Sequence, residues 1–100
     1  MPVDNTEAVS TVAKSLYSDE NQRLCAILRR ERLRAGLQQG ELAARLSRNQ
    51  SFVTRYETGQ KIIDVHELIA ICRALSYDPH LVLDELMSWS PPEATPNVAP

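Results

Sequence analysis

The stretch QGELAARLSRNQSFVTRYET, from Gln39 to Thr58, contains the pattern that decides the fold. Its apolar residues recur every three or four positions, which predicts two short helices at about 39–46 and 50–58. Only the three residues 47–49 separate these helices. Two helices joined by so short a turn form a helix-turn-helix, in which they cross at a steep angle.

The side chains inside this stretch suit two closely packed helices. Ala43 is small where the helices must approach each other, and Asn49 stands just before the second helix, which we expect it to cap. The residues expected to face the other helix or the core are Leu42, Leu46, Val53 and Tyr56. The stretch therefore predicts a motif with an apolar interior of its own.

Three further helices are expected around this motif. The first spans about 19–35, capped by Ser18 and ended by Gly36, where a left-handed residue is favoured. Another follows Asp64, which begins a capping box, and the last starts at Pro79. The residues expected to be buried are Leu24, Ile27, Leu28 and Ala35 in the first, Val65, Leu68, Ile69, Cys72 and Leu75 in the second, and Leu81, Val82, Leu83, Leu86 and Met87 in the third.

The sequence as a whole predicts an all-α fold, because it contains no alternating β-branched run and few Gly or Pro residues between its expected ends. We expect one compact five-helix domain over residues 18–89, since a chain of 100 residues leaves no room for a second. Residues 90–100 contain four prolines, which predicts a disordered tail.

Residues 1–17 are interpreted as a flexible N-terminal extension. One face of a short helix within it would carry Val9, Val12, Ala13 and Leu16. That face would pack either on the domain, which we favour, or on a second subunit.

Charge is distributed unevenly along the chain. The net charge of -2 is not typical of a protein that binds nucleic acid. Residues 22–61, however, contain nine basic and three acidic side chains, a net +6, whereas residues 1–21 carry -3 and residues 62–100 carry -5. Such a chain can present one positive face to phosphates, although these arginines could equally be solvated side chains on exposed helices. A general positive field, rather than direct contacts, is expected from Arg23, Arg29, Arg30 and Arg34.

Several classes of function find no support in the sequence. It contains no glycine-rich phosphate loop, no histidine pair at metal-binding spacing and no nucleophile with an evident His partner, so we expect no catalysis, metal or cofactor. Cys25 and Cys72 are interpreted as buried free thiols, with a redox pair as the alternative, and His66 and His80 are expected to face solvent. No apolar run or secretory signal suggests a membrane or export, which predicts a cytoplasmic protein.

Three segments carry a resemblance to a known family. They are GLQQGELA at 36–43, QSFVTRYETG at 50–59, and the helix that follows Asp64 and ends in Ala74-Leu75. Over roughly residues 24–86 the sequence resembles the lambda-repressor-like family, the Cro and XRE type of helix-turn-helix regulator. The resemblance implies that the third helix of the domain lies in the major groove of DNA while the second crosses the backbone.

Three positions differ from the pattern of this family. Gln38 stands where a Ser or Thr cap is usual, which leaves Glu41 as half of a capping box. Gly40 lies near the start of a helix, which it weakens by about 0.5 to 1 kcal/mol relative to Ala. Ser47 replaces the usual Gly of the turn, at a cost of ~1 kcal/mol if the residue is left-handed.

Matching positions in the family imply which side chains contact DNA. The implied base-reading residues are Gln50, Ser51, Arg55 and, more weakly, Thr54; those implied to contact phosphates are Gln39, Arg48, Thr58, Gln60 and Lys61. Gln pairs well with adenine and Arg with guanine. Arg32 and Glu57 match an internal ion pair between the first and third helices. The alternative for the exposed side chains is that they are simply solvated.

Together these patterns predict a sequence-specific transcriptional regulator of double-stranded DNA, a repressor that binds a pseudo-palindromic operator as a homodimer. Two copies are expected because one short helix reads only a few base pairs. The expected dimer interface comprises Leu83, Leu86, Met87 and Trp89 of the last helix. The alternative is a protein-binding module, such as the antitoxin of a toxin–antitoxin pair, which the acidic flanks would suit. Partner binding that survives replacement of Gln50 and Arg55 would favour it.

Overall fold

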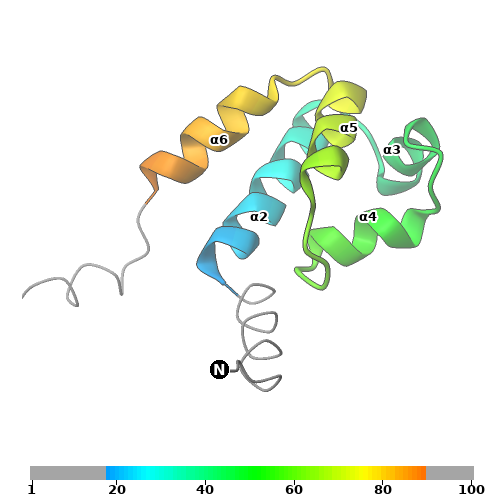
Figure 1. Cartoon of the computed structure of the whole chain (residues 1–100). Helices are drawn as coiled ribbons and strands as arrows, with labels where there is room; N and C mark the ends of the chain where they lie inside the picture. Colours follow the sequence, from blue (N-terminus) through cyan, green and yellow to red (C-terminus); the bar gives the residue numbers. More distant parts are fainter. Residues whose placement is uncertain (1–17, 90–100) are drawn as a thin grey trace, which may run out of the picture.

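The computed structural model describes residues 18–89, which form five helices without a strand (Figure 1). The helices are α2 (Asp19–Arg34), α3 (Gln39–Arg45), α4 (Gln50–Glu57), α5 (Val65–Leu75) and α6 (Pro79–Ser88). This arrangement confirms the expected five-helix, all-α fold. The expectations for residues 1–17 and 90–100 lie outside the described residues.

Local side-chain chemistry sets the ends of the helices. At the start of α2, Ser18 Oγ accepts a hydrogen bond from the Asn21 N–H at 3.1 Å, and Gly36 beyond its end is left-handed, with φ 76°. Asp64 and Glu67 form the expected capping box of α5, with N–H to carboxylate distances of 2.7 and 3.0 Å. These hydrogen bonds and the conformation of Gly36 confirm the expected helix ends. The sequence could predict them because each donor and acceptor are close together in the chain.

The first turn of α6 is capped by an aspartate. Asp78 Oδ1 accepts a hydrogen bond from the His80 N–H at 2.9 Å, and Pro79 occupies the first helical position. The His80 N–H stabilises the ionised carboxylate, which holds the pKa of Asp78 below its ordinary value. His80 and His66 are both exposed, as expected.

Asn49 is the N-cap residue of α4, but the expectation that its side chain caps the helix is wrong. The side chain of Asn49 makes no capping hydrogen bond; its Oδ1 instead accepts one from Ser51 Oγ at 2.6 Å. The main-chain carbonyl of Asn49 accepts from the Phe52 N–H at 3.1 Å. At the start of α3 the Glu41 carboxylate accepts from the Gln38 N–H at 2.7 Å, which is the half of the capping box that the sequence predicts.

The core lies where all five described helices meet. α2 contacts α4, α5 and α6, while α3 packs against α4 and α5. The large side chains with less than 2% exposure are Tyr56, Ile27, Leu28, Leu42, Ile71, Val53, Val82 and Cys72. Phe52 and Tyr56 meet edge to face, with ring centroids 5.5 Å apart. Because each helix contributes to one core, the scaffold holds α3 and α4 in a single arrangement.

Some of the burial expected from periodicity is wrong. Ala35 is exposed, because α2 ends one residue earlier and the chain turns away from the core. Val65 is 68% exposed, because the first turn of α5 extends past the edge of the core, and Ile71 is buried instead. Ile69 is half-buried. Leu68, Cys72 and Leu75 are buried as predicted, so the buried stripe of α5 runs through Ile71 rather than through Ile69.

α6 is less buried than its sequence predicts. Only Val82 is buried, and Leu86 is half-buried against the core. Leu81, Leu83 and Met87 are exposed. Apolar residues occupy more sides of this helix than its contacts with α2 and α5 can cover. Leu83 and Met87 lie one helical turn apart, and we call the surface that they form the apolar outer face of α6.

Cys25 and Cys72 are both buried and free, which confirms the interpretation as free thiols. Burial raises the pKa of both thiols to about 11, so the reactive thiolate is scarce at neutral pH. Of the helices in residues 18–89, none combines the length and apolar character needed to cross a membrane.

An ion-pair network joins α2 to α6. Arg30 binds the Glu85 carboxylate with both terminal nitrogens, at 2.7 and 2.9 Å, and Arg23 donates to the same carboxylate at 2.9 Å. Arg30 Nε also donates to Glu31 at 2.8 Å, and Arg34 lies 3.4 Å from Glu31. These ion pairs give Arg23, Arg30 and Arg34 a structural role that the expectation of a general positive field does not include. Their partners lie on another helix or on the same turn, where charge counting along the chain does not reveal them.

Candidate nucleic-acid interface

α3 and α4 form the helix-turn-helix, and the connection between them is tight. Ser47 in this connection is left-handed, with φ 57°, which lets the chain reverse within a few residues. Leu42, Ala43 and Val53 are buried between the helices and the core. The packing of these three residues fixes which side of α4 faces outward.

The outward face of α4 carries the predicted base-reading residues. Gln50, Ser51 and Arg55 are exposed, whereas Thr54 is half-buried. Ser51 and Arg55 lie one helical turn apart, and Gln50 begins the helix. Side chains that leave one face of a helix in this way can reach base edges when the helix enters a major groove. Their contacts with DNA remain a prediction.

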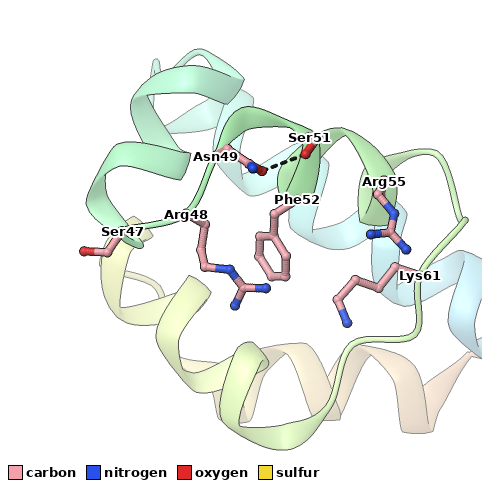
Figure 2. A pocket seen from close by; sticks show the side chains of 7 residues that line it. All are labelled: Ser47, Arg48, Asn49, Ser51, Phe52, Arg55 and Lys61. Carbon is pink, nitrogen blue, oxygen red and sulfur yellow. Dashed lines mark hydrogen bonds between the residues drawn. The ribbon is translucent and has the colours of Figure 1, made fainter.

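An open hollow of about 500 Å³ adjoins this face (Figure 2). The residues that line it are Ser47, Arg48, Asn49, Ser51, Phe52, Arg55 and Lys61. The guanidinium carbon of Arg48 lies 3.9 Å from the centroid of the Phe52 ring, and Lys61 Nζ lies 5.7 Å from it. The lining therefore contains three cations and no carboxylate, a composition suited to phosphate oxygens.

The predicted phosphate-contacting residues are not equally free. Lys61 Nζ lies 3.1 Å from Glu67 Oε2, so its charge is partly balanced within the molecule. The Thr58 hydroxyl donates to the Thr54 carbonyl at 2.8 Å, while Gln60 is exposed beyond the end of α4. Arg48, Arg55 and Lys61 are brought together by the hollow. Thr58 and Gln60, which follow the end of α4, do not line it.

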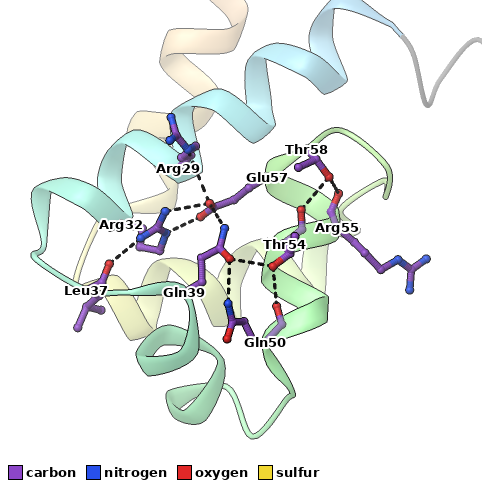
Figure 3. A network of polar contacts seen from close by, with 9 residues as sticks. All are labelled: Arg29, Arg32, Leu37, Gln39, Gln50, Thr54, Arg55, Glu57 and Thr58. Carbon is purple, nitrogen blue, oxygen red and sulfur yellow. Dashed lines mark hydrogen bonds and ion pairs between the residues drawn. The ribbon is translucent and has the colours of Figure 1, made fainter.

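Arg32 and Glu57 form a buried ion pair behind this face (Figure 3). Arg32 donates from Nε and Nη2 to the two carboxylate oxygens at 2.6 and 3.0 Å, and from Nη1 to the Leu37 carbonyl at 2.7 Å. The hydrogen-bonded carboxylate raises the pKa of Arg32 above its ordinary value. The pair ties α2 to the end of α4, so loss of either side chain would leave a buried charge without its partner.

Gln39 connects this ion pair to the outward face. Its Nε2 donates to Glu57 Oε1 at 2.9 Å, and its Oε1 accepts from Thr54 Oγ1 at 2.8 Å and from Gln50 Nε2 at 3.3 Å (Figure 3). Sequence reasoning places Gln39 only against phosphate and misses these contacts. The partners lie 11 to 18 positions away, and no local pattern links them.

The predicted dimer residues lie on or beside α6. Leu83 is 48% and Met87 85% exposed, whereas Leu86 and Trp89 are half-buried. Leu81, which was not predicted as a dimer residue, is 47% exposed on the same helix. Among residues 18–89, no group of three or more His, Cys, Asp or Glu side chains is placed to hold a metal ion.

The fold and the outward face of α4 define an XRE-like helix-turn-helix DNA-binding regulator fold. A family model described as a helix-turn-helix domain matches residues 23–84, so the chain belongs to the XRE-type helix-turn-helix family. No curated protein sequence matches the chain.

Solved structures with the same fold include regulators from several bacteria. An XRE-family like protein from Pseudomonas syringae pv. tomato str. DC3000 is 38% identical, with a TM-score of 0.70, over 80% of this chain and 98% of its own. The clp gene regulator ClgR from Corynebacterium glutamicum is 28% identical, with a TM-score of 0.64, over 69% and 73%. The restriction-modification controller protein C.AhdI from Aeromonas hydrophila is 27% identical, with a TM-score of 0.60, over 66% and 94%.

Proposed function

We propose that this protein is a transcriptional repressor that binds a pseudo-palindromic operator as a homodimer. The observation that carries the proposal is the exposure of Gln50, Ser51 and Arg55 on one face of a helix whose other face is locked into the core. A helix held in this way can read base edges without losing further backbone entropy on binding.

The outward side chains suit direct readout in the major groove. A glutamine such as Gln50 can donate to and accept from adenine, and Arg55 can donate two hydrogen bonds to guanine. Each such pair discriminates against a wrong base by ~1 to 3 kcal/mol. The Thr54 hydroxyl donates a hydrogen bond to Gln39 Oε1 at 2.8 Å, so Thr54 would read a base only as an acceptor.

Phosphate contacts would supply affinity and register. Two cations that line the hollow, Arg48 and Lys61, lie beside the readout face and would meet the backbone that borders the groove. Gln39, Thr58 and Gln60 are proposed as further backbone contacts. Binding should therefore weaken steeply as the salt concentration rises, because each neutralised phosphate releases counterions.

A homodimer would place two α4 helices in successive major grooves, about 34 Å apart. The apolar outer face of α6 is the surface we assign to the dimer, since Leu83 and Met87 are exposed there. A two-fold symmetric dimer reads an inverted repeat. A dimer bound at an operator that overlaps a promoter would block transcription without contacting any other protein. We therefore propose repression rather than activation.

Selection of bound sequences from a random duplex library tests the proposal. The wild-type protein should enrich an inverted repeat, and the double variant Gln50→Ala, Arg55→Ala should lose it. Arg73→Ala, an exposed arginine on α5, is the matched control and should retain the repeat. Only weak, salt-sensitive binding without enrichment would contradict the proposal and favour the protein-binding alternative.

A further inference from the structure

The carboxylate of Glu57 is more constrained than an ion pair alone requires. Its side chain is 2% exposed, and both of its oxygens accept hydrogen bonds from Arg32. Oε1 also accepts from Gln39 Nε2 at 2.9 Å, and Arg29 Nε lies 3.9 Å from the same oxygen. Glu57 is therefore held from α2 while it faces the first residue of α3.

This arrangement decides which way the amide of Gln39 points. An ionised carboxylate only accepts hydrogen bonds, so the amide group of Gln39 must turn its NH2 toward Glu57. Its oxygen then faces α4, where it accepts from the Thr54 hydroxyl at 2.8 Å and from Gln50 Nε2 at 3.3 Å. Two accepted hydrogen bonds occupy both lone pairs of this oxygen.

The same logic extends to Gln50 at the start of α4. One hydrogen of its Nε2 is directed to Gln39, which leaves the other hydrogen and Oε1 as a free donor and a free acceptor. These are the two groups that a glutamine uses on adenine. A reversed amide would exchange donor and acceptor and would not fit the same base.

We propose that Glu57 is a positioning residue for base readout, which acts through Gln39 to set the amide orientation of Gln50. The consequence for DNA binding rests on the proposed function. The two hydrogen bonds that link Glu57 to Gln39 and Gln39 to Gln50, which we call the relay, exist in the free protein. The relay holds an exposed side chain in its reading orientation before DNA arrives, which reduces the entropy lost on binding.

The first test uses the side-chain amide resonances of the free protein. Glu57→Gln preserves size and can still accept from Arg32, but it can turn an NH2 toward Gln39 and remove the constraint. The NH2 resonances of Gln50 should shift in this variant and in Gln39→Met, which leaves the Arg32–Glu57 pair intact. They should stay in place in Glu67→Gln, which removes the ion pair with Lys61.

Unchanged Gln50 resonances in Gln39→Met would overturn the relay. If Glu57→Gln does not fold, Gln39→Met carries the test alone, since Gln39 is half-buried and uncharged. A wild-type protein that selects no sequence would contradict the proposed function but would leave this spectroscopic test valid.

The second test measures discrimination on DNA in a double-mutant cycle. Glu57→Gln or Gln39→Met should reduce discrimination about tenfold at the base pair whose preference disappears in Gln50→Ala, and should have no such effect in a Gln50→Ala background. An equal loss on all sequences would show that Gln39 only contacts phosphate and would overturn the proposal.

Discussion

At the scale of single residues, Tyr56 carries a polar atom that the fold does not satisfy. Its side chain is fully buried, and its hydroxyl finds no hydrogen-bond partner within residues 18–89. Burial in this site raises the pKa of Tyr56 above its ordinary value. An unpaired buried hydroxyl costs about 1 to 3 kcal/mol, so the ring contributes packing while the hydroxyl opposes it.

Replacement of Tyr56 by Phe should therefore stabilise the protein. The ring and its edge-to-face contact with Phe52 remain, while the unpaired hydroxyl is removed. We expect the free energy of unfolding to rise by about 1 kcal/mol, or the melting temperature by about 4 to 8 °C. Thermal unfolding followed by circular dichroism measures it, with Tyr77→Phe, a half-buried tyrosine, as the control. A loss of stability would mean that the hydroxyl is paired in solution.

Ser47 stores strain in the turn between α3 and α4. Its φ of 57° is left-handed, which costs a residue with a Cβ about 1 kcal/mol. Ser47→Gly should therefore raise the free energy of unfolding by roughly 0.5 to 1 kcal/mol, measured by urea denaturation. Ser47→Ala keeps the Cβ and should give no such gain. Equal effects of the two variants would show that the Cβ is not the source of strain.

At the scale of helices, α6 is attached to α2 by one buried side chain and one ion-pair network. Val82 supplies the buried apolar contact, while Glu85 binds Arg30 and Arg23. The bonds from Arg30 lower the pKa of Glu85 below its ordinary value. Because the pair is partly exposed, we assign it a stabilisation of no more than about 1 kcal/mol.

The pairing of Glu85 predicts a pH dependence. Since the folded state binds a proton at Glu85 less readily than the unfolded chain, the stabilisation is fully present above the unfolded pKa of about 4.3. It declines as the pH falls through the lower pKa of the folded state. Glu85→Gln should lower the free energy of unfolding at pH 7 by up to about 1 kcal/mol, and the difference from wild type should shrink below about pH 4.

Urea denaturation across this pH range measures the effect. Asp84→Asn, the exposed neighbour on α6, is the control and should leave the profile near that of wild type. A difference between Glu85→Gln and wild type that is constant down to pH 3 would contradict the assignment of the effect to this carboxylate.

At the scale of the whole molecule, the readout helix and the apolar outer face lie at different ends. Figure 1 shows α3 and α4 at one end of the described part and α6 at the other. Leu83 and Met87 are exposed on α6, whereas Gln50 and Arg55 are exposed on α4. A second copy could therefore bind through α6 without covering the face proposed to read DNA.

Charge on the outer face of α6 should prevent dimer formation. We expect the wild-type protein to sediment as a dimer and the double variant Leu83→Lys, Met87→Lys to sediment as a monomer. At the same low protein concentration, the melting temperature of the double variant should differ little from that of wild type, because both replaced side chains are exposed. Val65→Lys, at an exposed apolar residue on α5, should leave the dimer intact. A wild-type protein that remains monomeric even on operator DNA would contradict the assignment.

The sequence was sufficient to predict most of the helix boundaries, although α2 ends one residue earlier than expected. Ser18, Asp64 and Asp78 cap helices through bonds to residues two or three positions away, and Gly36 turns left-handed where a helix stops. Such interactions are local, so residue order is enough to reveal them. The outward position of Gln50, Ser51 and Arg55 follows from helical periodicity and from the resemblance to a known family.

Contacts between helices depended on the tertiary structure. The bonds from Gln39 to Glu57 and from Arg30 to Glu85 join residues 18 and 55 positions apart, and each donor had other candidate partners. The burial of Ile71 rather than Val65 was decided by where α5 meets the edge of the core. Which polar groups meet depends on how helices are rotated against one another, and that rotation is set by the packing of the whole core rather than by any local pattern.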